Sequence, residues 1–386
     1  MIRTYKYRLR PNGTQNKLLD QLFWQSRGLY NNALEQRIVT YKESGKGYRY
    51  TDQWAYFRDE RKSNPDYNLL NATSVQQMLR RLDKAFSAFF RRIKKGENPG
   101  FPRFKGYRRF KSVEYRYGDG CKMRHKENGQ TRFYIQNVGE IKVVYHRPIP
   151  ETANIKHVVV KRFNEKWYVC LMMEIPDAPK ATHQGGCVGI DMGLKSLLAT
   201  SDGVLVENPQ WLRESQSQLR IAQRKAARRK IGSNRRRKAV QQVAILHEKI
   251  ANQRKDYWHK VARELANHYS LVALEDLNLK FMNRNKYLAL SSYDAGLGMF
   301  TKLIAYKVEE TGGQLVIVNP AYTSQACSQC GAIVEKSLAV RVHRCPECGL
   351  ELDRDVNAAR NILQKAFVAL GLSVQDLTWA NAPCVS

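Results

Sequence analysis

The chain has 386 residues, and its 65 Lys and Arg against 35 Asp and Glu give a formal net charge of +30 at pH 7. With 43% apolar and 10% aromatic residues it is not a disordered polycation, so a folded chain this basic requires a polyanionic partner. No run of about 18 apolar residues occurs, and the start, MIRTYKYRLR, lacks the apolar core of a signal peptide, so we expect neither membrane insertion nor secretion. Nucleic acid is therefore favoured over an anionic membrane surface as the partner.

The positive charge is concentrated in two stretches. Residues 80–111 hold twelve Lys and Arg against two acids, and residues 215–247 hold ten Lys and Arg and no acid. Each stretch thus has a net charge of +10, and together they carry two thirds of the excess. A solvated helix face normally mixes both signs, so the pattern indicates grooves for a phosphate backbone.

The N-terminal region begins with a predicted strand over residues 1–10, where Tyr5, Tyr7 and Leu9 alternate with basic residues. Thr14 is expected to cap the helix that follows. A second helix is predicted over residues 72–95, and its apolar stripe is core while its other side is basic.

From residue 112 to 175 the pattern changes to short β-branched and aromatic runs without intervening helices, which favours a small antiparallel barrel. The N-terminal strand would complete this barrel, which makes the helices of residues 14–95 an insertion. Residues 177–186, with two Pro or Gly clusters, are expected to form a linker.

The second half alternates apolar strands with helices, as an α/β sheet does. The predicted strands are CVGIDMG, SLLATSDGVLVE, LVALEDL and QLVIVNP. A long basic helical region over residues 209–269 contains a break at Gly232-Ser233-Asn234, which indicates a helical hairpin. Further helices are predicted over residues 296–311 and 356–370, before a C-terminal segment without periodicity.

Four of the eight cysteines form two C-x-x-C motifs, Cys327 with Cys330 and Cys345 with Cys348, each followed by glycine. One such turn presents two thiolates to one ion, so the pair of motifs predicts a closed tetrahedral Zn²⁺ site in a zinc ribbon. A redox pair requires only one motif. Because all four ligands are thiolates, this zinc folds the segment and takes no part in catalysis.

Three carboxylates stand at positions suited to a site for hard cations. Asp191 and Glu275 each end an apolar strand, and Asp355, close to Asp353, precedes a helix with small residues. Clustered carboxylate oxygens bind Mg²⁺, and two ions roughly 4 Å apart activate a water and stabilise the leaving oxygen of a phosphodiester. Each acid alone is more often a solvated strand end or a helix cap.

In chain order GIDMG, ALEDL, CSQC with CPEC, and DRDVNAARNI resemble the split RuvC nuclease and zinc ribbon of the TnpB family. Members of this family are transposon-encoded RNA-guided DNA endonucleases, similar to compact type V CRISPR effectors. The N-terminal half also resembles family blocks, in YKYRLRPNGTQ, SRGLYNNAL, QQMLRRLDKAFSAFF and NPGFPRFKG. The resemblance thus extends over nearly the whole chain.

The resemblance implies a RuvC triad of Asp191, Glu275 and Asp355 that holds two Mg²⁺ ions, with one structural Zn²⁺ in the ribbon. Asp353 is then a helix cap or a loop ligand, although spacing alone does not choose between Asp353 and Asp355. The implied fold is α+β and α/β multidomain, with an RNase H-like RuvC domain. The implied domains are a wedge-like β-barrel (1–13 and 106–180), a helical recognition insertion (14–105), the RuvC-like nuclease (181–320 and 350–370), the zinc ribbon (321–349) and a flexible tail (371–386).

The partners implied by the resemblance are a guide RNA derived from the transposon end and a double-stranded target DNA with a short target-adjacent motif. We expect a monomer on one RNA, in the bacterial or archaeal cytosol. The candidate nucleic-acid contacts are Tyr50, Gln76 and Gln77 near the DNA motif, Arg103 and Lys105 toward the RNA backbone, and Arg228, Arg229, Arg235 and Arg236 along the guide–target heteroduplex. Arg80 is a further candidate, assigned to neither RNA nor DNA.

Two other functions remain open from the sequence. A transposase or recombinase would use the same carboxylates for strand transfer, and its first chemical step would be identical. A non-catalytic nucleic-acid-binding regulator would need only the ribbon and the basic stretches, and Mg²⁺ would not change its behaviour.

Overall fold

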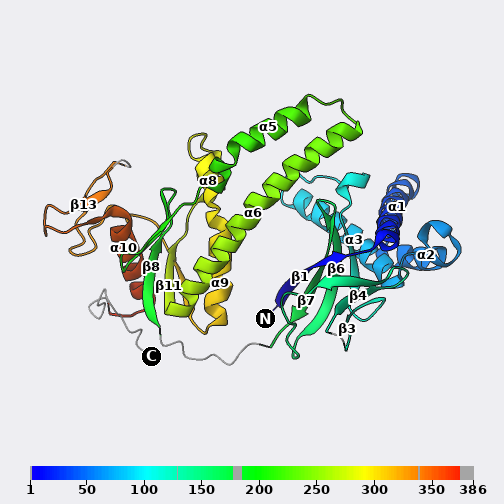
Figure 1. Cartoon of the computed structure of the whole chain (residues 1–386), viewed down its shortest axis with the longest axis horizontal. Coiled ribbons are helices and arrows are strands. Elements are labelled where there is room, and N and C mark those ends of the chain that lie inside the picture. The colour runs from blue at the N-terminus through cyan, green and yellow to red at the C-terminus, as the bar shows by residue number, and fades with distance from the viewer. Residues whose placement is uncertain (1, 128, 177–184, 338–339, 374–386) are drawn as a thin grey trace. The chain divides into compact units, whose positions relative to one another are not determined.

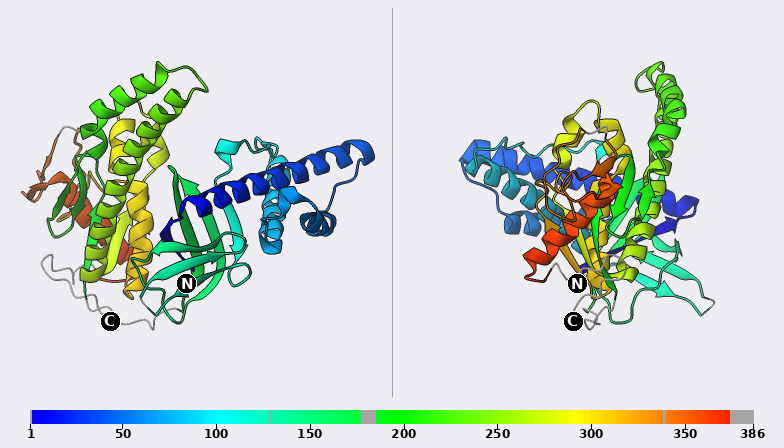
Figure 2. Two further views of the ribbon diagram at one scale, coloured as in Figure 1. Left: turned by 45° about the vertical axis from the view of Figure 1, so that its right-hand side comes forward. Right: turned by 90° about the vertical axis from the view of Figure 1, so that its left-hand side faces the viewer.

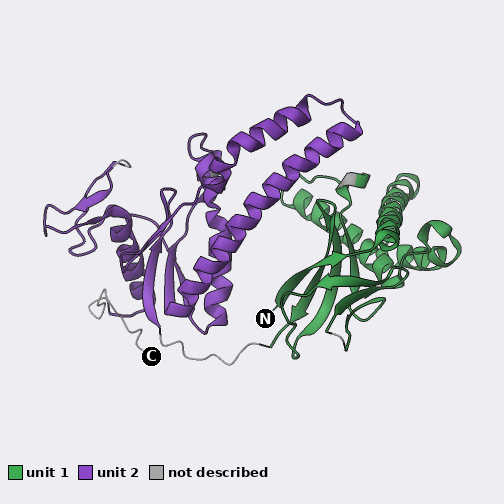
Figure 3. Ribbon diagram, in the orientation of Figure 1, with its two compact units in different colours: residues 1–177 green, residues 178–386 purple. Residues whose placement is uncertain are grey.

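The computed structural model describes residues 2–127, 129–176, 185–337 and 340–373. The chain divides into two compact units, Met1–Asp177 and Ala178–Ser386 (Figure 3). The linker expected over residues 177–186 lies mostly outside the described residues, as does most of the tail expected over residues 371–386. Within the described part of the chain, no helix has the length and apolar character needed to cross a bilayer.

Unit 1 contains a seven-stranded antiparallel sheet among its described residues, in the order β2-β6-β7-β1-β5-β4-β3 (Figure 1). β1 lies in the middle of this sheet and pairs with β7 and β5, so the N-terminal strand joins the later strands as predicted. The strands are β1 (Ile2–Arg10), β2 (Ser112–Arg116), β3 (Cys121–His125), β4 (Thr131–Ile135), β5 (Gly139–Val144), β6 (Asn154–Phe163) and β7 (Lys166–Glu174).

Helices inserted between β1 and β2 share one hydrophobic core with the sheet. The first helix begins one residue before the expected cap, because Asn12 and Gln15 form a reciprocal capping box there. The helices are α1 (Gly13–Ser44), α2 (Tyr50–Ser63) and α3 (Ala72–Lys94), with 3₁₀ turns at Pro65–Tyr67 and Tyr107–Arg109.

The closed barrel expected from the sequence is not confirmed. β2 and β3 are the two edges of the sheet, and no strand pairing joins them among the described residues. β3 was not predicted as a separate strand, because its short run, CKMRH, is mostly polar. Unit 1 is therefore described as a mixed α and β unit around an open sheet.

Unit 2 contains a five-stranded sheet in the order β10-β9-β8-β11-β12. β9 is antiparallel to both of its neighbours, β8 and β10, whereas β8, β11 and β12 run parallel to one another. The strands are β8 (Gly186–Asp191), β9 (Ser196–Thr200), β10 (Leu205–Glu207), β11 (Tyr269–Glu275) and β12 (Gln314–Val318).

Helices cover both faces of this sheet (Figure 1). α6 and α9 pack on one face, and α10 packs on the other, so the α/β layering predicted for the second half is confirmed. The helices are α4 (Trp211–Glu214), α5 (Gln216–Ala227), α6 (Asn234–His268), α7 (Leu279–Arg284), α8 (Ala289–Ala295), α9 (Leu297–Glu310) and α10 (Arg354–Ala369).

The predicted helical hairpin is present as α5 and α6 (Figure 2). Its turn contains Gly232, whose φ of 88° is accessible to glycine at little cost, and Ser233, whose side chain caps α6 by accepting from the Arg236 N–H. The cysteine motifs lie between β12 and α10, where the short strands β13 (Val342–Arg344) and β14 (Glu351–Asp353) pair.

Cys187, the second residue of β8, belongs to neither C-x-x-C motif and is disulfide-bonded.

Candidate active site

The alternation of side chains along β8 and β11 directs two carboxylates to one face of the sheet. Val188 and Ile190 of β8 enter the core with α6 and α9, so Asp191 points to the opposite face, where α10 lies. In β11, Val272 and Leu274 enter the same core, and Glu275 therefore joins Asp191 on the α10 face.

The third carboxylate arrives on α10. Asp355 is in the first turn of this helix, and Asp353 is its N-cap, whose carboxylate accepts from the N–H groups of Asp355 and Val356 at 2.8 and 3.3 Å. Asp353 therefore caps the helix, as the resemblance implied. Because the Asp353 carboxylate is bonded to the backbone, Asp355 is the better candidate of the two for a cation site.

Gly189, in the GID sequence of β8, allows α10 to approach the strand. A Cβ at this position would lie 2.8 Å from the Leu363 nitrogen and closer still to the Ala359 carbonyl oxygen. Real Cβ atoms do not make such contacts, so only glycine permits this packing. The small residues of α10 and Gly189 together bring Asp355 to the edge of the sheet where β8 ends.

The three acids interact electrostatically. Burial raises the pKa of Asp191 to about 8, and the negative charges of Glu275 and Asp355 contribute to the shift. Burial also raises the pKa of Glu275, whose side chain is only 7% exposed. Like charges gathered in this way favour a cation as a ligand, because a cation would relieve their repulsion.

Basic side chains border the acids, and the sequence did not single them out. Arg341 and Arg354 contact the Asp355 carboxylate at 3.4 and 3.3 Å. The charge of Lys365 on α10 opposes the rise that burial causes in the pKa of Glu275, and its ammonium donates to the carbonyl oxygen of Asn319 at 3.1 Å. Their only sequence signal is a position near the predicted acids, which many lysines and arginines share.

The donor set fits a divalent cation of the magnesium type. It consists of oxygens from three carboxylates, which such cations prefer, and two of the carboxylates stand at the ends of the paired strands β8 and β11. The three acids do not form a single compact ligand group among the described residues, where only the four cysteines do so.

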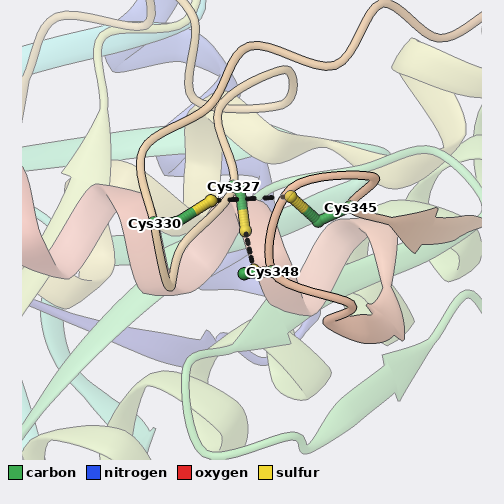
Figure 4. A group of neighbouring side chains, drawn as sticks. All are labelled: Cys327, Cys330, Cys345 and Cys348. Carbon is green, nitrogen blue, oxygen red and sulfur yellow. Dashed lines mark hydrogen bonds between the residues drawn. The ribbon is translucent and has the colours of Figure 1, made fainter.

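The four cysteines lie together (Figure 4). Their sulfurs are all within 4.8 Å of one another, with Cys327 to Cys348 at 3.6 Å and Cys330 to Cys345 at 3.5 Å. Four sulfurs bound at about 2.3 Å to one tetrahedral ion lie about 3.8 Å apart. The predicted cysteines are therefore brought together at spacings that match a zinc ion.

The two turns that carry these cysteines have matching backbone structures. The N–H groups of Gly331 and Gly349 donate to the carbonyl oxygens of Cys327 and Cys345 at 2.9 and 3.0 Å. Both glycines have positive φ, 79° and 74°, which other residues adopt at a cost. The glycines after each motif are thus required by the turns that aim the thiols inward.

Two asparagines of α10 fasten the segment between the cysteines and the carboxylates. Asn357 donates to the Ala326 carbonyl oxygen at 2.8 Å and accepts from the Ser328 N–H at 2.9 Å. Asn361 donates to the carbonyl oxygens of Thr323 and Ala326, both at 2.8 Å. Sequence reasoning missed both residues, although buried polar side chains four apart on one helix face are a signal of such a role.

Family comparisons match three parts of the chain. A model described as "Cas12f1-like, TNB domain" matches residues 298–362, one described as "Probable transposase" matches residues 170–286, and one described as "Helix-turn-helix domain" matches residues 1–46. Residues 2–44 form β1 and the single long helix α1 here, not two helices joined by a turn (Figure 2).

Whole-chain relatives decide the family. A "Putative RNA-guided DNA endonuclease" of Streptomyces pristinaespiralis is 33% identical over 375 residues, which cover 95% of this chain and 90% of the relative. "Putative RNA-guided DNA endonuclease InsQ" of Escherichia coli K12 is 29% identical, with 97% and 95% covered. The chain belongs to this family of RNA-guided DNA endonucleases, the TnpB family. The resemblance seen in the sequence motifs is thereby confirmed.

Solved structures share the fold of this TnpB-family chain. The protein of a "Cas12f1-sgRNA-target DNA complex" matches with a TM-score of 0.61 at 18% identity, covering 90% of this chain and 82% of the other. The "mini-RNA-guided endonuclease CRISPR-Cas_phi3" matches with a TM-score of 0.55 at 8% identity, covering 95% and 92%. At these identities the likeness concerns the fold alone.

The candidate DNA-motif contacts of this TnpB-family chain lie around the start of α3. Gln76 is half-buried and Gln77 is buried, with 9% exposed. Tyr50 is the first residue of α2, and the exposed Arg80 lies with its guanidinium 5.9 Å from the Tyr50 ring centroid. Tyr50 and Arg80 are thus brought together, whereas Gln77 has little surface to offer a ligand.

The two candidates of the FPRFK block, Arg103 and Lys105, differ in exposure and in the contacts that they make. Arg103 is exposed, and no ion pair engages it among the described residues. Lys105 is half-buried, its main chain is bonded to Asn31, and its ammonium lies 5.5 Å from the ring of Tyr30. The block is therefore fixed to α1 and presents Arg103 outward.

The four candidate arginines of the hairpin also differ in exposure. Arg228, Arg229 and Arg235 are exposed. Arg236 is half-buried, and its guanidinium donates to the carbonyl oxygens of Ala226 and Arg229 at 3.2 and 3.1 Å, which closes the end of α5. The first three can meet a phosphate backbone, and the fourth holds the hairpin turn.

Proposed function

We propose that the chain is an RNA-guided DNA endonuclease whose RuvC-like site hydrolyses phosphodiester bonds of target DNA. The observation that carries the chemistry is the meeting of Asp191, Glu275 and Asp355 on the α10 face of one sheet, with the pKa of Asp191 raised to about 8. The use of an RNA guide and of DNA as the substrate is inferred from the relatives, which are named as putative RNA-guided DNA endonucleases.

In this proposal Asp191, Glu275 and Asp355 hold two Mg²⁺ ions, which would activate a water and stabilise the leaving oxygen of the scissile phosphate. The residues of the chain supply position and charge. The two strand ends and the first turn of α10 fix the three carboxylates, and Arg341 and Arg354 screen Asp355 before the cations bind.

The cysteine site has a structural role in this proposal. All four donors are thiolates, so a zinc ion there has no open position for a substrate or water. The zinc would fold the ribbon of residues 321–349 against α10. The remaining proposed domains are a wedge-like domain of residues 1–13 and 106–180 built on the open sheet of unit 1, the inserted recognition helices of residues 14–105 and the RNase H-like RuvC domain of residues 181–320 and 350–370.

The two basic stretches bind nucleic acid in this proposal. The guide RNA, derived from the transposon end, would contact Arg103 and Lys105 through its backbone, and the guide–target duplex would follow Arg228, Arg229 and Arg235. Tyr50, Gln76 and Arg80 would lie near the target-adjacent DNA motif. A structural relative was solved as a complex with guide RNA and target DNA, which supports partners of this kind. The proposal also includes a single chain on one RNA, acting in the bacterial or archaeal cytosol.

The test uses the protein co-expressed with RNA from its transposon end. The purified complex should cut matched double-stranded DNA in Mg²⁺ and leave unmatched DNA intact, and Glu275→Gln should abolish cutting while the bound RNA is retained. Cutting that persists in Glu275→Gln, or that does not depend on the bound RNA, would contradict the proposal.

Strand transfer is a second candidate, favoured by the match of residues 170–286 to a model described as a probable transposase. The same carboxylates would serve the same first step. Joined products from supplied donor ends, formed without bound RNA, would identify this activity, whereas hydrolysed products alone would support the nuclease.

A further inference from the structure

A hydroxyl group contacts the most buried of the three acids. Thr323 donates its hydroxyl to the Oε1 atom of Glu275, and the side chains are 2% and 7% exposed. Because Glu275 is buried, a carboxylate oxygen that lost this partner would not gain water in exchange. Thr323 lies four residues before Cys327 and belongs to neither the carboxylate triad nor the cysteine site.

The loop that carries Thr323 is held in a strained conformation. Tyr322 has φ of 62°, in the left-handed region, and the hydroxyl of Thr323 also lies 2.9 Å from the Pro320 carbonyl oxygen. A residue other than glycine adopts this conformation at a cost of about 1 kcal/mol or more, so surrounding contacts must maintain it. This conformation directs Thr323 back toward the end of β11.

Those contacts come from α10. Asn361 binds the carbonyl oxygen of Thr323 itself, and it shares the Ala326 carbonyl oxygen with Asn357. Asn357 is fully buried and Asn361 is 5% exposed. The helix that carries Asp355 therefore also fixes the segment that holds Glu275.

The same segment leads directly into the cysteine site. The N–H of Cys327 donates to the Ala332 carbonyl oxygen at 2.8 Å, and the next N–H, of Ser328, donates to Asn357 at 2.9 Å. Residues 323–328 are thus bonded at one end to Glu275, in the middle to α10, and at the other end to the first cysteine turn.

We propose that Thr323 is a positioning residue that orients Glu275 for cation binding, and that Asn361 and the cysteine turn set the place of Thr323. The Thr323 hydroxyl carries one proton, so it donates to Glu275 or to Pro320 at any moment. The charged carboxylate is the stronger acceptor. Groups that orient ligands in this way are typically worth about 10- to 100-fold in metal affinity or activity.

The inference rests on the proposed nuclease function, and its experiment separates the two. The purified RNA complex is assayed for target cutting as a function of Mg²⁺ concentration, and its melting temperature is measured with and without Mg²⁺ as a readout of cation binding. Glu275→Gln should abolish cutting in this assay. If it does not, the proposed function fails before Thr323 is considered.

Thr323→Val removes the hydroxyl at nearly constant shape, and Thr323→Ser keeps it. We expect Thr323→Val to require about 10- to 100-fold more Mg²⁺ for half-maximal cutting and to lose most of the Mg²⁺-dependent rise in melting temperature. Thr323→Ser should restore both. The control is Thr311→Val, at the other end of β12, where the hydroxyl bonds only to carbonyl oxygens of its own helix.

The link to α10 is tested with a double-mutant cycle. Asn361→Leu removes both carbonyl contacts and should resemble Thr323→Val, and the double variant should be no worse than either single one. Gln25→Met is the control, because the buried Gln25 amide also donates to a backbone carbonyl oxygen, that of Pro65 at 3.2 Å, and has no bond to residues 323–328 among the described residues. It should leave the Mg²⁺ requirement unchanged.

Three results would overturn the inference. The first is a Thr323→Val variant with the Mg²⁺ requirement of the unmodified complex. The second is a Thr323→Ser variant as impaired as Thr323→Val, which would indicate a packing role. The third is additive losses from Thr323 and Asn361, which would show that the two residues act independently.

Discussion

Asp191 and Glu275 end two neighbouring parallel strands, each one residue beyond the paired residues Ile190 and Leu274. Parallel pairing and a common side-chain direction leave these two carboxylates side by side at the strand ends, where their like charges repel. Burial raises the pKa of Asp191 to about 8, and the negative charge of Glu275 adds to the rise. The site is thus organised for a ligand at the expense of the stability of the free protein.

Asp191→Asn should therefore stabilise the protein in the absence of divalent cations. The pKa of Asp191 is 3.8 in an unfolded chain and about 8 in the folded one, so between these values the folded chain retains a proton that the unfolded chain releases. Raising the pH from about 4 to 8 thus lowers the free energy of unfolding. Removing this penalty should raise stability at pH 8 by about 1 kcal/mol or more, since one pKa unit equals about 1.4 kcal/mol.

The measurement is the melting temperature of the variant and the unmodified protein in a chelator, from pH 5 to 8. The gap should widen with pH and reverse in excess Mg²⁺, because only the unmodified protein gains from the cation. Asp276→Asn, which changes the exposed acid that follows β11, is the control and should show no gap. A pH-independent difference would contradict the electrostatic explanation.

Gly189→Ala should separate α10 from β8. The added Cβ would meet the Ala359 and Leu363 backbone, which cannot move without displacing the whole helix. Overpacking of this kind costs about 1–3 kcal/mol, and the shift of Asp355 should reduce cutting more than the loss of stability alone explains. The comparison is Gly28→Ala, in the middle of α1 with open space around its Cβ, which should raise the melting temperature slightly.

Zinc removal should unfold the ribbon while the sheet of unit 2 remains folded. The ribbon has two short strands and few apolar contacts beyond the cysteine turns, so the metal is its main source of stability. We expect one zinc per chain by elemental analysis. After chelation or Cys345→Ser, limited proteolysis should cut within residues 329–350 first. A ribbon that resists protease without metal would contradict this role.

The sequence predicted the elements whose local signals are strong. The apolar run that ends at Asp191 forms β8 as predicted, and the spacing of the cysteines corresponds to the cluster found in the fold. Local sequence signals did not predict side-chain environments that depend on tertiary contacts. Gln77 is polar yet buried, and nothing in the sequence distinguishes Arg236, which closes a hairpin, from its exposed neighbour Arg235.

The sequence predicted the acids of the candidate site but not the residues that hold those acids in place. A carboxylate at a strand end can be recognised from the apolar run before it. Thr323 and Glu275 are 48 positions apart in the sequence, and only the path of the folded loop brings them into contact. Asn361 is fixed by that same loop. Long-range hydrogen bonds of this kind leave no periodic trace, so only the folded chain reveals them.

Arg235 and Arg236 offer a final prediction, since adjacent residues of one type have different environments. Arg235 is exposed and is engaged in no ion pair among the described residues, whereas Arg236 bonds two carbonyl oxygens of the hairpin turn. Arg235→Gln should therefore weaken nucleic-acid binding and reduce the slope of log affinity against log salt by about 1, with the melting temperature unchanged.

Arg236→Gln should behave differently, because glutamine cannot span both carbonyl oxygens. The hairpin turn should become more sensitive to protease near Gly232, and the affinity should fall with a smaller change in salt slope than in Arg235→Gln. Fluorescence anisotropy with the guide RNA at several salt concentrations gives the slopes, and proteolysis gives the local stability. Equal slopes and equal protease resistance in the two variants would show that both arginines bind phosphate, and that the contacts of Arg236 with the turn are dispensable.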